Sequence, residues 1–235
     1  MTKNEYGLLD SMVNLDKHST IIGMTGSGKT VFANWFVNKK SQQEIPVIYI
    51  SAKAEAPEFY ERFSLHTEDI KEALTALIDP EIGSISLRIP YMGGGHLLGI
   101  FNSIEMFAIR NLEEEIFYPL CVVVDEVSLL VRHKMESSPA TLALGRAAAI
   151  WRGFNLQLVV MSQRTAGIPQ TVLTQANSII LFHFKQADVA NLGKSIGKNI
   201  EGDFEWLAQN PFHFVEYVGN DAVRYLPIPF KEVEK

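Results

Sequence analysis

The feature that most constrains this chain is a glycine-rich stretch near its N-terminus, residues 23–30, which reads GMTGSGKT. Its spacing fits the pattern G-x-x-x-x-G-K-[ST] of phosphate-binding loops. Glycine lets backbone N–H groups approach phosphate oxygens without a Cβ in the way, and the helix that follows adds the positive end of its dipole. A turn that merely joins a strand to a helix needs neither a lysine nor a hydroxyl group at the last two positions. The stretch therefore predicts a site for a nucleoside triphosphate.

Two side chains of this loop have distinct expected roles. Lys29 is expected to reach the β- and γ-phosphates and to act in catalysis, and the hydroxyl group of Thr30 is expected to ligate Mg²⁺. ATP and Mg²⁺ are therefore the expected ligands. The residues expected to surround the nucleotide phosphates are Gly23, Met24, Thr25, Gly26, Ser27, Gly28, Lys29, Thr30 and Val31.

A second motif, Asp125 followed by Glu126, comes directly after the apolar run at residues 119–124. A buried strand carries such acids to the carboxyl edge of the sheet, beside the phosphates. There Asp125 is expected to hold Mg²⁺, usually through a water molecule, and Glu126 to accept a proton from the attacking water or to orient it. Gln163 ends the next buried run, and its amide is expected to bridge this water and the γ-phosphate. Acids after an apolar run are common by chance, so this interpretation depends on the glycine-rich loop.

Apolar runs without alternation are typical of strands that are buried on both faces of a parallel sheet. Such runs alternate along this chain with stretches of helical character, which predicts parallel strand–helix–strand units. We expect an α/β fold with a mainly parallel central sheet flanked by helices and a C-terminal β-hairpin about Gly219. The expected strands are residues 18–22, 46–51, 84–89, 119–124, 156–161, 179–184, 211–218 and 223–226, and the expected helices are residues 29–39, 58–63, 67–78 (with Thr67 as N-cap), 96–115, 138–152 (with Ser137 or Ser138 as N-cap), 188–195 and 203–208.

Composition limits the classes of function that remain. The 235 residues, 47% of them hydrophobic, suffice for one large α/β domain that spans residues 1–235. Because the net charge is −6, a DNA partner would be met by a local basic patch and not by the field of the whole surface. The single Cys121 excludes an internal disulfide, and no apolar stretch reaches the roughly 18 residues that a spanning helix needs, so we expect a soluble intracellular protein.

The motifs at residues 23–30, 122–126 and 158–164 resemble the three motifs of the HerA–FtsK superfamily of P-loop DNA-pumping ATPases. The stretch at 151–184 is especially similar, since Ser-Gln-Arg stands where the family has Thr-Gln-Arg and is followed by Ile-Pro and a short helix. The segment at 53–55, with Lys53 and Glu55, is similar to a family loop of the Lys-x-x-Glu type, with one residue instead of two between the charges. The resemblance implies a P-loop NTPase fold of the RecA/FtsK type.

Within that superfamily, this short chain is most similar to the genome-packaging ATPases of tailless viruses, including the membrane-containing tectivirus-like phages. This resemblance implies ATP hydrolysis at the subunit interfaces of a homo-oligomeric ring, expected to be a hexamer, that drives double-stranded DNA into a preformed capsid. Binding to DNA would be independent of base sequence, and the proteins of the capsid vertex would be further partners. The implied location is the host cytoplasm or the virion, and peripheral contact with a viral membrane is compatible with it.

The resemblance also implies an arginine finger that acts on the nucleotide of a neighbouring subunit. Many relatives carry this arginine two or three residues before the glycine that opens the sensor strand, where this chain has no arginine. Arg152 directly precedes Gly153 and is the first candidate, and Arg146 is the second. Arg164 is the third guanidinium near the site, and the alternative for each of them is an ordinary solvated or salt-bridged arginine.

Other functions remain open from the residues alone. One is an ATPase that extrudes filamentous phage or moves another macromolecule, although such proteins usually carry a membrane-spanning segment. A slow nucleotide-dependent switch is disfavoured because a switch does not need Glu126, and a small-molecule kinase is disfavoured because the chain lacks a lid-like arginine cluster. The candidate contacts to DNA phosphates are Arg132, His133, Lys134, Lys194 and Lys198.

Overall fold

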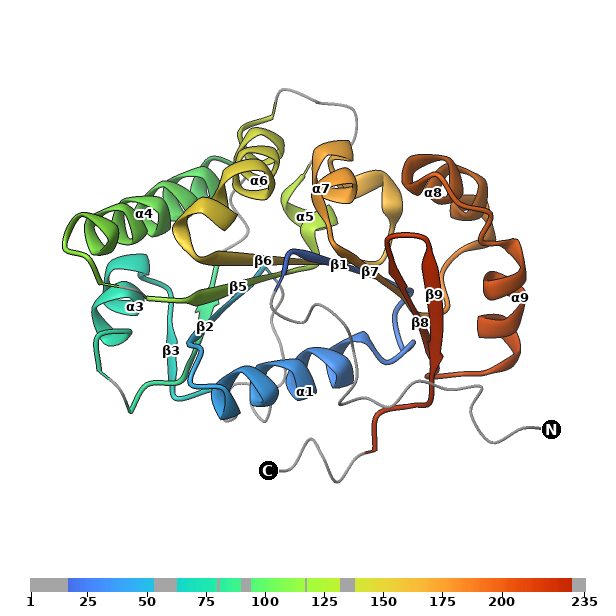
Figure 1. Ribbon diagram of the computed structural model, residues 1–235, viewed down its shortest axis with the longest axis horizontal. Coiled ribbons are helices and arrows are strands. Elements are labelled where there is room, and N and C mark those ends of the chain that lie inside the picture. Colours follow the sequence, from blue (N-terminus) through green and yellow to red (C-terminus); the bar gives the residue numbers. More distant parts are fainter. Residues whose placement is uncertain are drawn as a thin grey trace.

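The computed structural model describes residues 17–52, 63–79, 81–89, 94–116, 118–131 and 138–229. These residues form a nine-stranded sheet in the order β3-β4-β2-β5-β6-β1-β7-β8-β9 (Figure 1). The strands are β1 (Ser19–Ile22), β2 (Val47–Ser51), β3 (Leu65–Thr67), β4 (Ser84–Arg88), β5 (Leu120–Asp125), β6 (Leu156–Ser162), β7 (Ser178–Leu181), β8 (Phe214–Val218) and β9 (Asp221–Tyr225).

The sheet is parallel from β3 to β7 and antiparallel from β7 to β9. β1 lies between β6 and β7, so that Ile21 is opposite Met161 on one side and Ile180 on the other. All residues of β1, β2, β5, β6 and β7 are buried, because helices cover both faces, and this explains why these segments are apolar without alternation. The predicted α/β class, with a mainly parallel sheet and a C-terminal hairpin, is confirmed.

Helices cover the two faces of this sheet. α1 lies on one face, and α4, α6 and α7 lie on the other (Figure 1). Phe32 and Trp35 of α1 belong to one core cluster, whereas Phe101 of α4 and Leu144 of α6 belong to the other. Among the residues described, none of the helices combines the length and the apolar character that crossing a membrane requires. The helices are α1 (Lys29–Gln42), α3 (Ile70–Ala76), α4 (Gly94–Glu113), α5 (Val127–Leu130), α6 (Pro139–Ile150), α7 (Gln170–Gln175), α8 (Val189–Ile196) and α9 (Glu201–Gln209), with the 3-10 turns η2 (Trp151–Phe154), η3 (Thr165–Gly167) and η4 (Gln186–Asp188).

The helix expected over residues 67–78 begins later, as α3, and Thr67 is not its N-cap. The carboxylate of Asp69 caps α3 by accepting the N–H of Lys71 at 2.8 Å. Thr67 instead ends β3, and its hydroxyl group accepts the N–H of Asp69 at 3.0 Å. A strand of three residues is too short to show a period, which is why the sequence did not predict β3. The helix expected over residues 58–63 falls almost entirely outside the described residues.

The start of α6 is as expected, and its end is not. The hydroxyl group of Ser138 caps this helix by accepting the N–H of Thr141 at 3.2 Å. The helix ends two residues before the predicted end, because the chain tightens into η2. In η2 the indole N–H of Trp151 donates to the buried carboxylate of Glu105 at 3.0 Å, and the left-handed φ of 58° at Asn155 then turns the chain into β6.

Candidate nucleotide-binding site

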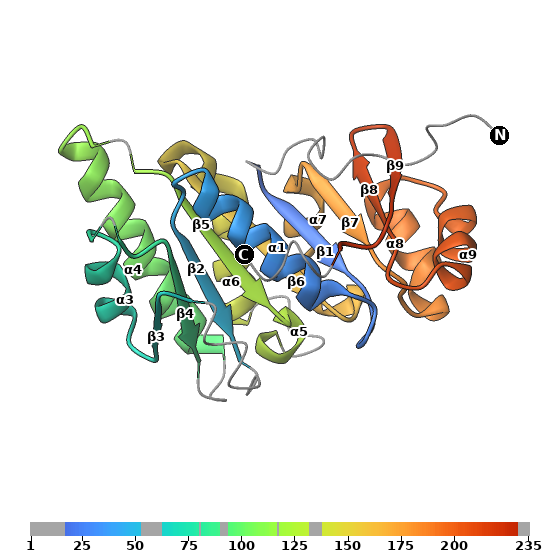
Figure 2. The ribbon, with the colours of Figure 1, turned by 90° about the horizontal axis from the view of Figure 1, so that it is seen from below.

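Three segments that the sequence singled out meet at one edge of the sheet. β1 leads into the loop at residues 23–28, β5 ends in Asp125, and Gln163 directly follows β6. These three strands are parallel neighbours in the order β5-β6-β1, so their carboxyl ends share one edge. Figure 2 shows α5 and the loop between β1 and α1 at this edge.

The glycines of the loop are required by its backbone. Gly26 and Gly28 have left-handed φ values of 77° and 108°, which glycine adopts without strain. At Gly23 a Cβ would lie 2.6 Å from both the Cβ of Phe182 and the Oγ of Ser27, so a side chain has no room there. The sequence pattern of the loop is therefore a consequence of its conformation and of its close packing on the residue that follows β7.

Lys29 folds back over this loop. Its side chain is buried, and its ammonium group donates hydrogen bonds to the carbonyl oxygen of Gly23 and, at 3.1 Å, to that of Met24. Those carbonyls hold the positive charge inside the curve of the loop, where a phosphate group would bind. Gly23 and Met24 thus contact the lysine and do not themselves line the cavity described next.

A cavity of about 470 Å³ opens at this edge of the sheet. Lys29 and Thr30 reach it from the start of α1, Asp125 from the end of β5, and Gln163 from the loop after β6. The structure therefore brings residues of all three motifs to one cavity, whose size is within the range of roughly 300–1,000 Å³ that small-molecule sites have. Its lining residues are Thr25, Gly26, Gly28, Lys29, Thr30, Val31, Asp125, Gln163, Phe182, Phe212, Pro227 and Ile228.

The carboxylate of Glu126 is held in a fixed position. The residue is 2% exposed and has a left-handed φ of 50°, a conformation that is uncommon for a residue other than glycine. Its Oε1 atom accepts hydrogen bonds from the hydroxyl group of Ser128 and, at 3.2 Å, from the backbone N–H of Gln163. Backbone strain of this kind is concentrated at functional sites, and here two donors from different segments fix the carboxylate.

Ser128 itself is fixed by the segment that follows Gln163. A Cβ on Gly167 would lie 2.7 Å from the Cβ and 2.8 Å from the Cα of Ser128, so η3 packs directly against α5. The absence of a side chain at Gly167 is what permits this contact. Neither residue was predicted from the sequence, because a serine two positions after the acidic pair and a glycine in a loop carry no pattern of their own.

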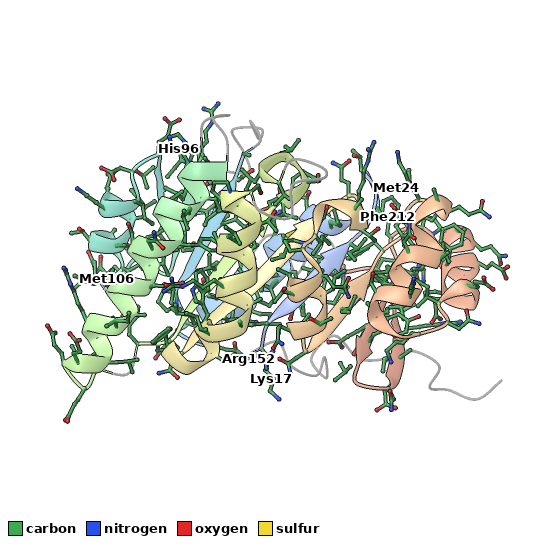
Figure 3. All side chains as sticks on the ribbon, turned by 90° about the horizontal axis from the view of Figure 1, so that it is seen from above. Lys17, Met24, His96, Met106, Arg152 and Phe212 are labelled. Atoms are coloured by element: carbon green, nitrogen blue, oxygen red, sulfur yellow. The ribbon has the colours of Figure 1, made fainter. Side chains whose placement is uncertain are left out.

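The candidate arginines do not line the cavity of their own subunit. Arg146 forms an ion pair of 2.8 Å with Glu105, and Arg152 donates a hydrogen bond to the carbonyl oxygen of Gln175. Figure 3 shows Arg152 beside Lys17, at the edge of the molecule opposite Met24 of the loop. An arginine that acts on a neighbouring subunit would lie away from its own pocket, so the assignment of the finger stays a prediction. Of the other candidates, Lys53, Glu55, Arg132, His133 and Lys134 lie outside the described residues.

The cavity has donors for a metal ion that arrives with a nucleotide. Within the described part of the chain, no three His, Cys, Asp or Glu side chains are close enough to hold a metal ion by themselves. Thr30 and the carboxylate of Asp125 line the same cavity, however. Mg²⁺ at phosphate sites usually takes one or two carboxylates and completes its shell with phosphate oxygens and water. This donor set therefore fits Mg²⁺ bound together with a triphosphate.

One wall of the cavity was not predicted from the sequence. Phe182 follows β7, Phe212 precedes β8, and Pro227 and Ile228 follow β9. These four apolar residues lie far from the glycine-rich loop in the sequence. Phe182 reaches the loop because β7 pairs with β1, whereas Phe212, Pro227 and Ile228 reach it only through the return of the C-terminal hairpin to the sheet. In the sequence they are indistinguishable from core residues.

A glycine-rich loop that joins the central strand to a helix, with an acidic strand end beside it, defines the class of P-loop NTPases. No family model matches this chain, and no curated protein sequence matches it either. Among solved structures, the chain is similar to the genome packaging NTPase B204 from Sulfolobus turreted icosahedral virus 2 in complex with ATP-gammaS, with a TM-score of 0.73 and 17% identity over 92% of this chain and 100% of that chain.

Two further solved structures are similar to this chain to a comparable extent. The DNA-packaging ATPase B204 from Sulfolobus turreted icosahedral virus has a TM-score of 0.74 and 16% identity over 91% of this chain and 98% of that chain. VirB4 of Thermoanaerobacter pseudethanolicus has a TM-score of 0.69 and 14% identity over 95% of each chain. Likeness at this level of identity shows the fold. The P-loop NTPase fold that the resemblance to HerA–FtsK proteins implied is confirmed.

Proposed function

We propose that this protein is an ATPase that hydrolyses ATP with Mg²⁺ and uses the reaction to move double-stranded DNA into a viral capsid. The observation that carries the ATPase part is that Lys29, Asp125 and Gln163, each from a different motif, line one cavity. The part concerning DNA is supported by the three sequence motifs and by the similar fold of B204, which is described as a genome packaging NTPase.

Each residue of the site has a part in the proposed reaction. A triphosphate in the loop would compete with the two carbonyl oxygens for the ammonium group of Lys29, which would then neutralise the β- and γ-phosphate oxygens. Glu126, fixed by its two donors, would accept the proton of the attacking water, and the side-chain amide of Gln163 would orient that water. Thr30 and Asp125 would hold Mg²⁺, which when bound neutralises charge on the phosphate oxygens.

The resemblance extends this proposal to the assembly. Residues 1–235 would act as one unit within a homo-oligomeric ring, a hexamer by analogy, with ATP hydrolysed between neighbouring subunits and an arginine supplied across the interface. Contact with DNA would be to phosphates and independent of base sequence, as a pump requires. The proteins of the capsid vertex would be further partners, in the host cytoplasm or in the virion, and a peripheral contact with a viral membrane is compatible with this arrangement.

Hydrolysis of ATP with and without long duplex DNA tests the proposal. We expect turnover that duplex DNA stimulates, loss of nucleotide binding in Lys29→Ala, and retention of binding with turnover at least about 10²-fold lower in Glu126→Gln. Lys71→Ala is the matched control, because Lys71 is an exposed lysine of α3 away from the cavity. A folded oligomer that turns over no ATP in either condition would remove the proposal. A rate of ATP hydrolysis that duplex DNA does not change would instead favour an ATPase that moves another macromolecule.

A further inference from the structure

The cavity has two chemically different sides, and the strand order separates them. Asp125 ends β5 and Gln163 follows β6, and both strands lie on one side of β1. Phe212 precedes β8 and Pro227 follows β9, and these strands lie on the other side of β1. A triphosphate bound by the loop after β1 would therefore have polar groups on one side and an apolar wall on the other.

Phe212 combines an exposed aromatic side chain with a strained backbone, two features that suit a residue that binds a ligand. Its side chain is 55% exposed, although it is a large aromatic group at the wall of a cavity. Its φ of 65° is left-handed, which is strained for a bulky residue. A hydrogen bond stabilises this turn: the N–H of His213 donates to the carbonyl oxygen of Asn210 at 3.3 Å. Backbone strain of this kind clusters at active sites and ligand clamps.

Phe212 is also close to the start of α1. A Cβ on Gly28 would lie 3.8 Å from the Cα of Phe212, and Gly28 directly precedes Lys29. Figure 3 shows Phe212 at the same edge of the molecule as Met24 of the loop. The helix start is where phosphates bind, so the part of a nucleotide beyond its phosphates would extend from there along the apolar wall.

We propose that Phe212, Pro227 and Ile228 bind the nucleobase of a purine nucleoside triphosphate, with the ring of Phe212 against the face of the base. The inference rests on the proposed function, because the triphosphate must occupy the loop. A base has a π-face, so an apolar and aromatic wall recognises it by stacking and contact area. The side chains of these three residues cannot donate or accept hydrogen bonds, and proline has no backbone N–H. Adenine and guanine are therefore accepted alike, and the smaller pyrimidines bind more weakly.

Calorimetric titrations with Mg-ATP, Mg-GTP, Mg-CTP and Mg-tripolyphosphate test the inference. Phe212→Gly removes the ring and keeps the turn, because glycine adopts a φ of 65° freely. We expect this variant to bind ATP and GTP roughly 5- to 150-fold more weakly than the wild type and to bind tripolyphosphate equally well. Phe212→Tyr keeps the stacking face and should retain wild-type affinity. Leu226→Ala is the matched control, since Leu226 is exposed to a similar extent, 51%, but does not line the cavity.

The tripolyphosphate titration distinguishes failure of this inference from failure of the proposed function. Wild-type affinity of Phe212→Gly for ATP would overturn the base site and leave the triphosphate site intact. A wild-type preference for ATP over GTP greater than about 10-fold would also overturn it, because such a preference requires a hydrogen bond to the edge of the base, which the side chains of this wall cannot make. Wild-type protein that binds neither ATP nor tripolyphosphate would remove the proposed function, and the base site with it.

Discussion

Replacing Gly167 with alanine tests whether the packing between η3 and α5 controls the position of Glu126. The added Cβ would lie 2.7 Å from the Cβ of Ser128 and 2.8 Å from its Cα, and the second of these atoms belongs to the backbone, which cannot rotate away. Reaching an ordinary contact of 3.4 Å requires a shift of roughly 0.7 Å between the two segments. Overpacking of this kind costs about 1–3 kcal/mol of the free energy of unfolding.

The catalytic effect is expected to exceed the effect on stability. The hydroxyl group of Ser128 and the backbone N–H of Gln163 both bind Oε1 of Glu126, and the shift displaces the first donor relative to the second. Misplacement of a catalytic group by about 1 Å can lower a rate about 10²-fold. We therefore expect kcat for ATP to fall about 10²-fold in Gly167→Ala, with KM nearly unchanged, because the loop and the apolar wall stay intact.

A coupled assay of phosphate release gives kcat and KM, and a titration with a nucleotide analogue gives the affinity. Gly202→Ala in α9 is the matched control, because a Cβ there meets no heavy atom within 4 Å. It should keep the wild-type kcat and unfold at the same or a slightly higher temperature. A Gly167→Ala variant that is folded and turns over ATP at the wild-type rate would refute the argument that this contact positions Glu126.

Three further predictions concern single hydrogen bonds and charges. Ser128→Ala removes a donor to the carboxylate of Glu126 and should lower kcat about 10-fold or more, with nucleotide affinity unchanged; an unchanged kcat would contradict this. Burial and the nearby Arg152 guanidinium lower the pKa of His18 from 6.5 to about 4, so the folded protein favours neutral histidine. As the pH falls from 6.5 towards 4, the free energy of unfolding, measured by denaturant titration at each pH, should therefore drop by about 3 kcal/mol more in the wild type than in His18→Asn. An equal drop in both proteins would contradict this. Arg146→Ala leaves the buried Glu105 without its cation and should lower the free energy of unfolding by about 1.5–3 kcal/mol, measured the same way.

The phosphate side of the site was predictable because each of its motifs lies at the carboxyl end of a single strand. A glycine-rich turn after β1 and an acid at the end of β5 are recognisable in a few consecutive residues, and the parallel pairing of the strands brings them together. The parallel character of the sheet was predictable from the uniformly apolar runs, which are typical of strands buried on both faces, whereas the strand order was not predicted. Gln163 was predictable for the same reason, since it directly follows β6, the strand that lies between β5 and β1.

The apolar wall was not predictable because its parts have no local signature. Phe212 lies in a turn and Pro227 after the last strand, and both come to the loop only through the antiparallel pairing of β7, β8 and β9. The strand β3 was missed for a related reason, since three residues do not establish a period. In both cases the information lies in tertiary pairing, whereas the sequence shows only residue types that suit any core or loop.

The contacts of Arg152 and Arg146 indicate what it would cost each of them to reach a neighbouring subunit in the proposed ring. Arg146 balances a carboxylate, that of Glu105, which is buried, so moving it to another subunit's phosphate would leave a buried charge without its cation. Arg152 donates to the carbonyl oxygen of Gln175, a neutral group. Water can replace Arg152 at this exposed carbonyl oxygen, whereas the carboxylate of Glu105 is buried and would be left without its cation. Arg152 would therefore be released at the lower cost, and its assignment as the arginine finger of the proposed ring stays a prediction.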